Sequence, residues 1–280
     1  MKKLIIPNSI EQISLTLKYA DAYLIGIKGL CVNVNWEVDI DELSDIKQII
    51  KDKELFIALN KNMTNNDIDI LNKVLIELNG YNIKGVFYAD TCIVSLFNKQ
   101  SLNYDLVWSN EHATTNYNTI NYWYDFNVKY TYISADITLN EIIDIKKNTN
   151  SKLIVPIFGY LPMFVSKRHI VKNYLEYFNL KDNSKINYIE KENSIYPIID
   201  NNIGTIVYSN NVLNGLDYYE ILKNNNIEYV TFNAFNISNE DFIRVLKVYN
   251  NESNEKISDI LTNIDDGFLN KETISRVKRW

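Results

Sequence analysis

The sequence predicts an α/β protein that folds as a TIM-like (β/α)8 barrel, with a small β-rich insertion near residues 180–203. Short apolar runs rich in β-branched and aromatic residues alternate with longer amphipathic stretches. This alternation is typical of parallel strands that are buried on both faces and separated by helices. About eight strand–helix units can be recognised, a number that favours a closed barrel over the alternative, an open doubly wound sheet.

Each predicted strand is a short apolar run that ends in polar or turn-forming residues. The runs are residues 3–7, 22–27, 55–60, 85–90, 105–110, 130–136, 152–158, 204–211 and 228–235. The predicted helices carry apolar residues at helical spacing and span residues 10–19, 40–51, 67–78, 117–126, 139–147, 216–223, 239–249 and 257–262. Thr138 and Glu141 stand at the spacing of a capping box, which places the start of one helix at residue 139.

The chain of 280 residues is long enough for a single barrel. We expect residues 1–250 to form this domain and residues 251–280 to form a polar and basic extension that packs on it. Between residues 180 and 203, short strand-like pieces are interrupted by Asn, Asp and Lys, which indicates a hairpin inserted into the barrel.

Composition excludes several classes of function. The formal net charge is −6, so the overall field does not favour phosphate backbones, although a local basic patch is compatible with RNA binding. Cys31 and Cys92 lack the spacing of a zinc site and suit a reducing compartment. No apolar window approaches the length of a membrane span, so we expect a cytoplasmic protein without membrane contact. The chain has no glycine-rich phosphate loop and no GxSxG motif.

Polar side chains follow most of the predicted strands. Because the carboxyl ends of parallel strands meet at one rim, these side chains are the candidates for a site. The strand 152–158 is expected to stop at Gly159 and to open into a loop that contributes three of them. The candidates are Asn60, Asp90, Asn110, Glu111, His112, Asp136, Ser166, Arg168, His169 and Asn233. Both histidines of the chain belong to this set, which is the strongest signal that the residues give by themselves.

Proton transfer is the chemistry that these residue types suit. His112 and His169 would act as acid or base, Asp90 and Asp136 would orient them, and Arg168 would hold an anion. A single divalent metal bound by two histidines and a carboxylate is the rival arrangement. Structural roles are the other alternative: Asp90 and Asp136 stand where helix caps or turns are expected, and Asn60 can satisfy backbone groups at a strand end.

Five blocks of the sequence are similar to the peptidase U32 family. They are the segment 20–26, the run that ends at Asn60, the run that ends at Asp90, the stretch containing Ser109, Asn116 and Trp123, and the segment 153–174. The resemblance implies a TIM-like barrel and a peptidase or collagenase-like protease. It adds Asn116 to the substrate-binding set of Asn60, Asn110, Ser166, Arg168 and Asn233. The family also includes RNA and quinone hydroxylation factors, several of which hold an iron–sulfur cluster.

The chain departs from the family pattern at several positions. Asp136 and Ile154 stand where the family has glutamate, and Pro162 and His169 stand where it often has cysteine. Two separate thiols cannot supply the four thiolates of an iron–sulfur cluster, so no cofactor is predicted.

Three functions therefore compete. The first is hydrolysis of a peptide bond in a pocket at the barrel mouth, with a peptide or small-molecule substrate. The second is an accessory role in the hydroxylation of RNA, either tRNA or rRNA, or of a small molecule. The basic residues 276–279 and the Lys167–Arg168 pair motivate this role. The third is a non-catalytic member that keeps only the fold. The sequence does not specify the oligomeric state.

Overall fold

The computed structural model describes residues 1–110, 112–182 and 184–271. Within these residues, eight parallel strands form a closed barrel, because the last strand pairs with both the first and the one before it. The strands are β1 (Lys2–Ile6), β2 (Ala22–Ile27), β4 (Glu54–Ala58), β5 (Gly85–Tyr88), β6 (Asp105–Trp108), β7 (Tyr130–Tyr132), β8 (Lys152–Ser166) and β12 (Tyr229–Asn233). The predicted barrel is confirmed.

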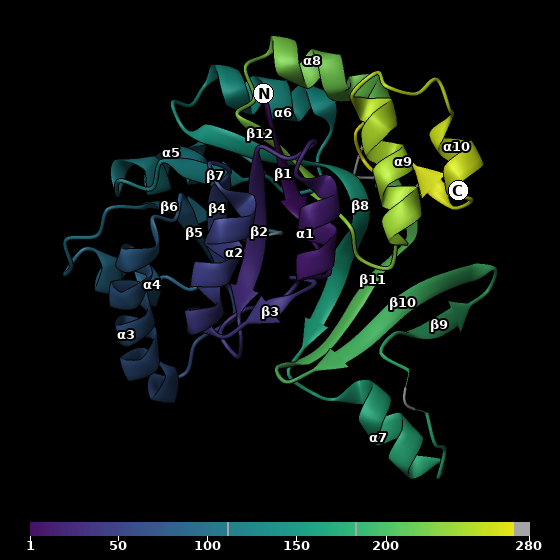
Figure 1. Ribbon diagram of the computed structural model, residues 1–280, viewed down its shortest axis with the longest axis horizontal. Helices are drawn as coiled ribbons and strands as arrows, with labels where there is room; N and C mark the ends of the chain where they lie inside the picture. The colour runs from purple at the N-terminus through teal and green to yellow at the C-terminus, as the bar shows by residue number, and fades with distance from the viewer. Residues whose placement is uncertain (111, 183, 272–280) are drawn as a thin grey trace, which may run out of the picture.

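Helices connect the barrel strands and surround them (Figure 1). They are α1 (Ile10–Thr16), α2 (Leu43–Ile50), α3 (Ile68–Leu78), α4 (Cys92–Phe97), α5 (Tyr117–Asp125), α6 (Leu139–Lys147), α8 (Tyr219–Asn224) and α9 (Asn239–Tyr249). Short 3-10 turns lie at Ile40–Glu42, Asn65–Asp67, Asn79–Tyr81 and Leu216–Tyr218, and a two-residue strand β3 (Glu37–Val38) pairs with β2. The predicted capping box opens α6, where Thr138 and Glu141 exchange hydrogen bonds.

The barrel interior is filled by apolar side chains from alternate positions of the strands. Phe56 is at its centre, and its ring meets those of Phe87 at 5.6 Å and Tyr229 at 5.4 Å between centroids. A second and larger apolar cluster lies between the barrel and the surrounding helices. The strands are therefore buried on both faces, as their continuous apolar runs predict.

Strand β8 differs from its prediction. It does not stop at Gly159 but continues to Ser166, because β11 (Gly204–Asn214) pairs with it antiparallel from Phe158 to Ser166. Gly159 has a φ of +118°, and a Cβ atom there would lie 2.3 Å from the carbonyl oxygen of Asn233. Glycine thus allows β8 to pass close to β12 and leave the barrel.

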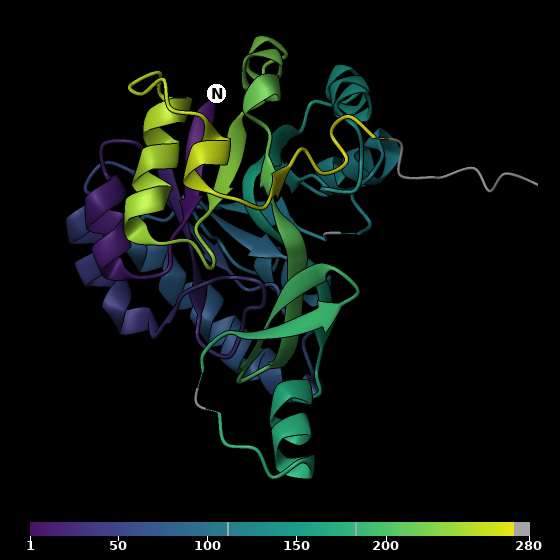
Figure 2. The ribbon, with the colours of Figure 1, turned by 90° about the vertical axis from the view of Figure 1, so that its right-hand side faces the viewer.

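The prediction that residues 204–211 form a barrel strand is wrong, since β11 runs antiparallel to β8. The predicted β-rich insertion is confirmed in β9 (Asn187–Lys191) and β10 (Ser194–Asn201), which pair with each other and with β11. It also contains a helix that the sequence did not predict, α7 (Ile170–Tyr177). We call residues 160–211 the arm. Figures 1 and 2 show that the arm extends beyond the carboxyl ends of the barrel strands, with α7 farthest out.

After α9, the chain passes through α10 (Ile257–Ile260) to β13 (Ile264–Asp265), which pairs parallel with β11 beside Val212 and Leu213. The described part of the extension therefore lies against the base of the arm, whereas the basic residues 276–279 lie outside the described residues. In the part of the chain that the structure describes, no helix is long and apolar enough to cross a membrane.

Candidate functional site

A cavity of about 450 Å³ opens at the carboxyl ends of the barrel strands, and we call it the mouth cavity. Its barrel side is lined by amide side chains from the loops after β2, β4 and β6, namely Asn33, Asn60, Asn62 and Asn110. Its arm side is lined by residues that include Phe164, Ser166 and Lys167. The cavity exists because β8 continues past the barrel and places these side chains opposite the strand ends.

Several amide groups of the mouth cavity are free to bind a ligand. Asn60 uses its Oδ1 to accept a hydrogen bond from the backbone amide of Val32 at 2.9 Å. The side chains of Asn62 and Asn110 make no hydrogen bond to any other described residue. An amide group offers both a donor and an acceptor, so this wall can recognise a neutral polar ligand in a defined orientation.

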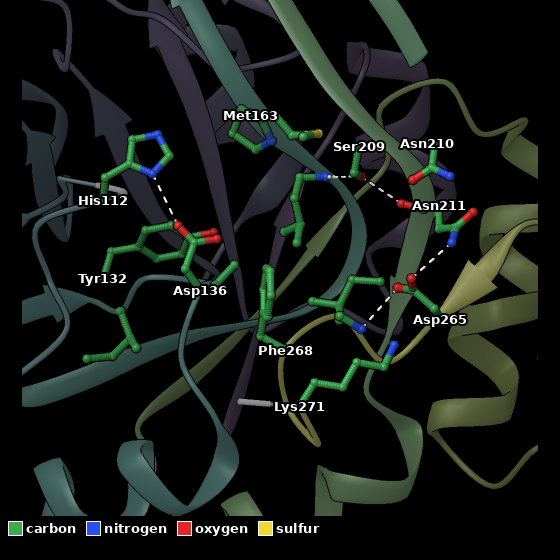
Figure 3. Close-up of a pocket in the computed structure, with 16 residues that line it drawn as sticks. His112, Tyr132, Asp136, Met163, Ser209, Asn210, Asn211, Asp265, Phe268 and Lys271 are labelled. Carbon is green, nitrogen blue, oxygen red and sulfur yellow. Dashed lines mark hydrogen bonds and ion pairs between the residues drawn. The ribbon is translucent and has the colours of Figure 1, made fainter. Parts of the chain in front are cut away.

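A second cavity of about 490 Å³, which we call the side cavity, lies between the barrel, the base of the arm and the C-terminal segment (Figure 3). The barrel contributes His112, Tyr132 and Asp136. The arm contributes Met163, Ser209, Asn210 and Asn211, and the C-terminal segment contributes Asp265, Phe268 and Lys271. Both cavities have volumes typical of small-molecule sites.

His112 is part of the lining of both cavities, and it is paired with a carboxylate. Its Nδ1 lies 3.2 Å from Oδ2 of Asp136, and Figure 3 shows the two side chains pointing toward each other. They meet because they follow the adjacent strands β6 and β7. The side chains are 65% and 49% exposed, so a substrate in either cavity could reach this pair directly. A carboxylate that orients an imidazole is the arrangement needed for proton transfer.

Three predicted site residues make hydrogen bonds that hold the protein itself. Asp90 accepts the backbone amides of Cys92 and Met63, both at 2.9 Å. Burial opposes the charged form of Asp90, but these amides outweigh it and keep the pKa of the carboxyl below its usual value. Asn116 caps the start of α5 through the amide of Thr119. Asn233 accepts the amide of Phe235 and a side-chain donor of Asn35, so it fixes the loops around it.

The remaining predicted residues lie on the arm. Ser166 reaches the mouth cavity, and its Oγ accepts the backbone amide of Arg168 at 3.1 Å. Arg168 and His169 stand at the start of α7 and line neither cavity. The structure thus brings Asn60, Asn110, His112 and Ser166 to one cavity with Asp136 beside them, and it leaves Arg168 and His169 outside. Glu111 lies outside the described residues.

Comparison with known proteins identifies the family. The model of peptidase family U32 matches residues 8–273. The chain belongs to the peptidase U32 family. It is 24% identical over 285 residues to tRNA hydroxylation protein P2 of Bacillus subtilis (strain 168), a match that covers 91% of this chain and 92% of that protein.

Solved structures similar to this U32 chain share its fold. One is phosphoribosyl anthranilate isomerase from Thermus thermophilus, with a TM-score of 0.50, 8% identity and coverage of 90% of this chain and 99% of that one. Another is 3-hexulose-6-phosphate synthase, with a TM-score of 0.47, 11% identity and coverage of 84% and 90%. At these identities, the likeness concerns the barrel and not the site.

The departures from the U32 pattern can now be placed. Ile154, which stands where the resemblance expects glutamate, is wholly buried among apolar side chains inside the barrel, so it lies away from both cavities. Asp136, the shorter replacement for the other glutamate, is the partner of His112. The carboxylate that this U32 protein retains is therefore the one at the side cavity.

Neither cysteine of this U32 protein is set up as a nucleophile. Burial and the neighbouring Glu37 raise the pKa of the Cys31 thiol well above its usual value. Burial and Asp90 raise the pKa of Cys92 to about 12. Both thiols are thus protonated near neutral pH. Among the described residues, no group of three or more His, Cys, Asp or Glu side chains is placed to hold a metal ion.

Sequence reasoning missed four residues of the mouth cavity: Asn33, Asn62, Phe164 and Lys167. Asn33 follows β2, so the rule that strand ends form the site would have found it. Asn62 lies two residues beyond Asn60 and was open to the same argument. Phe164 and Lys167 gave no such signal, because their position depends on the pairing of β8 with β11 far along the chain.

Proposed function

We propose that this U32 protein is a component of a tRNA hydroxylation system and that its mouth cavity binds a nucleoside of the tRNA. The observation that carries the proposal is the match to tRNA hydroxylation protein P2, which spans 91% of this chain and 92% of that protein. A match of this extent includes both the barrel and the arm, and therefore every segment that lines the mouth cavity.

The chemistry of the mouth cavity supports a nucleoside as its ligand. The amides of Asn62 and Asn110 can pair with the donor and acceptor edge of a base. Phe164, which is about half exposed, offers a ring on which a base can stack, and Lys167 supplies a positive charge for a phosphate. All three kinds of contact converge on one cavity.

His112 has a defined part in this proposal. It lies where the mouth cavity meets the side cavity, and Asp136 holds its imidazole by the Nδ1 atom. The opposite ring nitrogen is then available to a bound nucleoside, to which it can give or from which it can take a proton. The chain's own contribution is thus to bind and orient the nucleoside and to move a proton at His112.

The test is made in the native host. Deletion of the gene is expected to remove a hydroxylated nucleoside from digests of total tRNA, as measured by liquid chromatography and mass spectrometry. A plasmid carrying the wild-type gene should restore it, whereas His112→Ala and the double variant Asn62→Ala/Asn110→Ala should restore it poorly. Tyr122→Ser, an exposed change on α5, is the matched control and should restore it fully. An unchanged set of tRNA nucleosides in the deletion strain would contradict the proposal.

A second function, peptide hydrolysis, is favoured by one observation. The His112–Asp136 pair opens onto the side cavity, where a general base could activate water beside the polar side chains of Ser209 and Asn210. Under this hypothesis, His112→Ala lowers cleavage of a peptide library by about 100-fold or more. His169→Ala, which changes a residue outside both cavities, leaves cleavage unchanged. Equal cleavage by wild type and His112→Ala would remove this pair from the mechanism.

A further inference from the structure

Helix α7 exposes an apolar face that no other part of the described chain covers. Ile170, Tyr174, Tyr177 and Phe178 follow one another at helical spacing, and all four are exposed, Tyr177 by 80%. None of the residues of α7 is buried. Apolar surface of this extent is unfavourable in water, and a contiguous patch of it marks a surface that contacts a partner.

This face consists mainly of aromatic rings in contact. The ring centroids of Tyr174 and Phe178 are 4.8 Å apart, and those of Tyr177 and Phe178 are 4.9 Å apart. The start of the helix is fixed to the arm, because the backbone amide of Ile170 donates to Thr205 Oγ1 and that of Lys172 donates to Asp200 Oδ2. The rings are therefore presented on a helix whose first turn is held in place.

Positive charges lie between these rings and the mouth cavity. Lys167 lines the cavity, and Arg168 follows it directly before α7. Neither side chain forms an ion pair with another described residue, whereas Lys172 is 3.9 Å from Glu176. Residues 160–203 contain six Lys or Arg and five Asp or Glu, although the whole chain has 29 and 35. The arm thus lacks the excess of negative charge that the rest of the molecule carries.

We propose that the arm binds a single-stranded segment of RNA, with bases stacked on Tyr174, Tyr177 and Phe178 and phosphates held by Lys167 and Arg168. Unpaired cations next to exposed aromatic rings are the two components of a single-strand binding surface. Their continuity with the mouth cavity means that nucleotides adjoining a bound nucleoside would run along α7. The inference rests on the proposed function, since it takes tRNA as the ligand of the mouth.

The experiment measures the affinity of the full chain for purified total tRNA by fluorescence anisotropy over a range of salt concentrations. The variant Tyr174→Ser/Tyr177→Ser/Phe178→Ser is expected to bind about tenfold or more weakly with an unchanged salt dependence, because it removes stacking and no charge. Lys167→Ala/Arg168→Ala should lower the slope of log affinity against log salt by about 1. Tyr122→Ser is the matched control and should bind as the wild type does. Circular dichroism melting confirms that each variant is folded.

Two results would overturn the arm proposal. One is wild-type affinity for tRNA in the triple aromatic variant. The other is the same affinity accompanied by a change from a dimer to a monomer in size-exclusion chromatography with light scattering, which would assign the face to a second copy of the chain. If the wild type restores tRNA hydroxylation while either result holds, only the arm proposal fails. If the wild type neither binds tRNA nor restores hydroxylation, the proposed function fails as well.

Discussion

The two ends of the barrel treat polar side chains in opposite ways. At the amino ends of the strands, the Glu54 carboxylate accepts hydrogen bonds from Lys2 Nζ at 3.0 Å and from the buried Tyr229 hydroxyl, and Lys84 Nζ lies 3.9 Å away. At the carboxyl ends, Asn62 and Asn110 have no hydrogen-bond partner among the described residues, and two cavities open. One end is sealed by satisfied charges, and the other leaves polar groups free for a ligand.

This difference follows from the direction of the strands. The loops at the carboxyl ends can vary without disturbing the barrel, so a ligand site is placed there. The opposite end must close over the aromatic layer that Phe56 centres, and it does so with an ion pair and a tyrosine hydroxyl. Substitutions at the closed end should therefore affect stability, whereas substitutions at the mouth should affect binding.

The largest effect is expected at the aromatic layer below the closed end. Phe56→Ala should lower the free energy of unfolding by about 3–5 kcal/mol, because it leaves a cavity among rings that cannot move together. Urea unfolding followed by circular dichroism measures this. Phe164→Ala, which removes a half-exposed ring at the mouth, should change the same quantity by less than about 0.5 kcal/mol. Similar losses in the two variants would contradict the distinction between the ends.

The next effect concerns the charge that seals the barrel. Glu54→Gln keeps the shape of the side chain but removes the charge that faces Lys2, so we expect unfolding to become easier by about 1–2 kcal/mol. Glu252→Gln removes the partner of Lys18 in an exposed pair, and it should leave urea unfolding unchanged. If the two variants unfold at the same urea concentration, the Glu54 contacts do not seal the barrel.

The mouth should give the reverse result. Asn110→Ala removes an amide that bonds no other described residue, so the free energy of unfolding should stay within about 0.5 kcal/mol of the wild type. Affinity for tRNA should fall about fivefold, which is the loss of one hydrogen bond to a ligand. Anisotropy and urea unfolding of the same preparation measure both quantities. Loss of stability with unchanged affinity would make Asn110 a structural residue.

The smallest effect sharpens the comparison at the one mouth loop where a charge is paired. The ammonium group of Lys61, together with the amide and hydroxyl of Thr64, lowers the pKa of Asp67 to about 2. Because this value is below the unfolded value of about 3.9, the contribution to stability is complete above pH 4 and is lost as the pH falls toward 2.

Asp67→Asn should therefore reduce stability at pH 5 and have less effect near pH 2, as measured by urea unfolding at both values. Asp69→Asn is the matched control, since the Asp69 carboxylate bonds no other described residue, and it should change stability little at either pH. A difference between wild type and Asp67→Asn that stays the same at pH 5 and pH 2 would contradict the role of the ionised carboxylate.

Much of the barrel and part of the mouth could be predicted from sequence. Buried parallel strands leave continuous apolar runs, and the polar residue that ends such a run must lie at the rim, which is how Asn60 and Asn110 were found. The same rule gave Asp90, Asn116 and Asn233, whose side chains bond the backbone of nearby residues instead. Sequence does not distinguish a polar residue that supports a loop from one that faces a cavity.

What the sequence by itself determined is the alternation of buried strands and helices, because burial on both faces is written locally in each apolar run. Only the tertiary structure decided that β8 continues beyond Gly159, since the hydrogen bonds that extend it come from β11 some 40 residues later. That pairing carries Arg168 and His169 away from the rim and brings Lys167 to it. It also creates the cavities on which His112 and Asp136 meet, because strand pairing is a contact between distant segments.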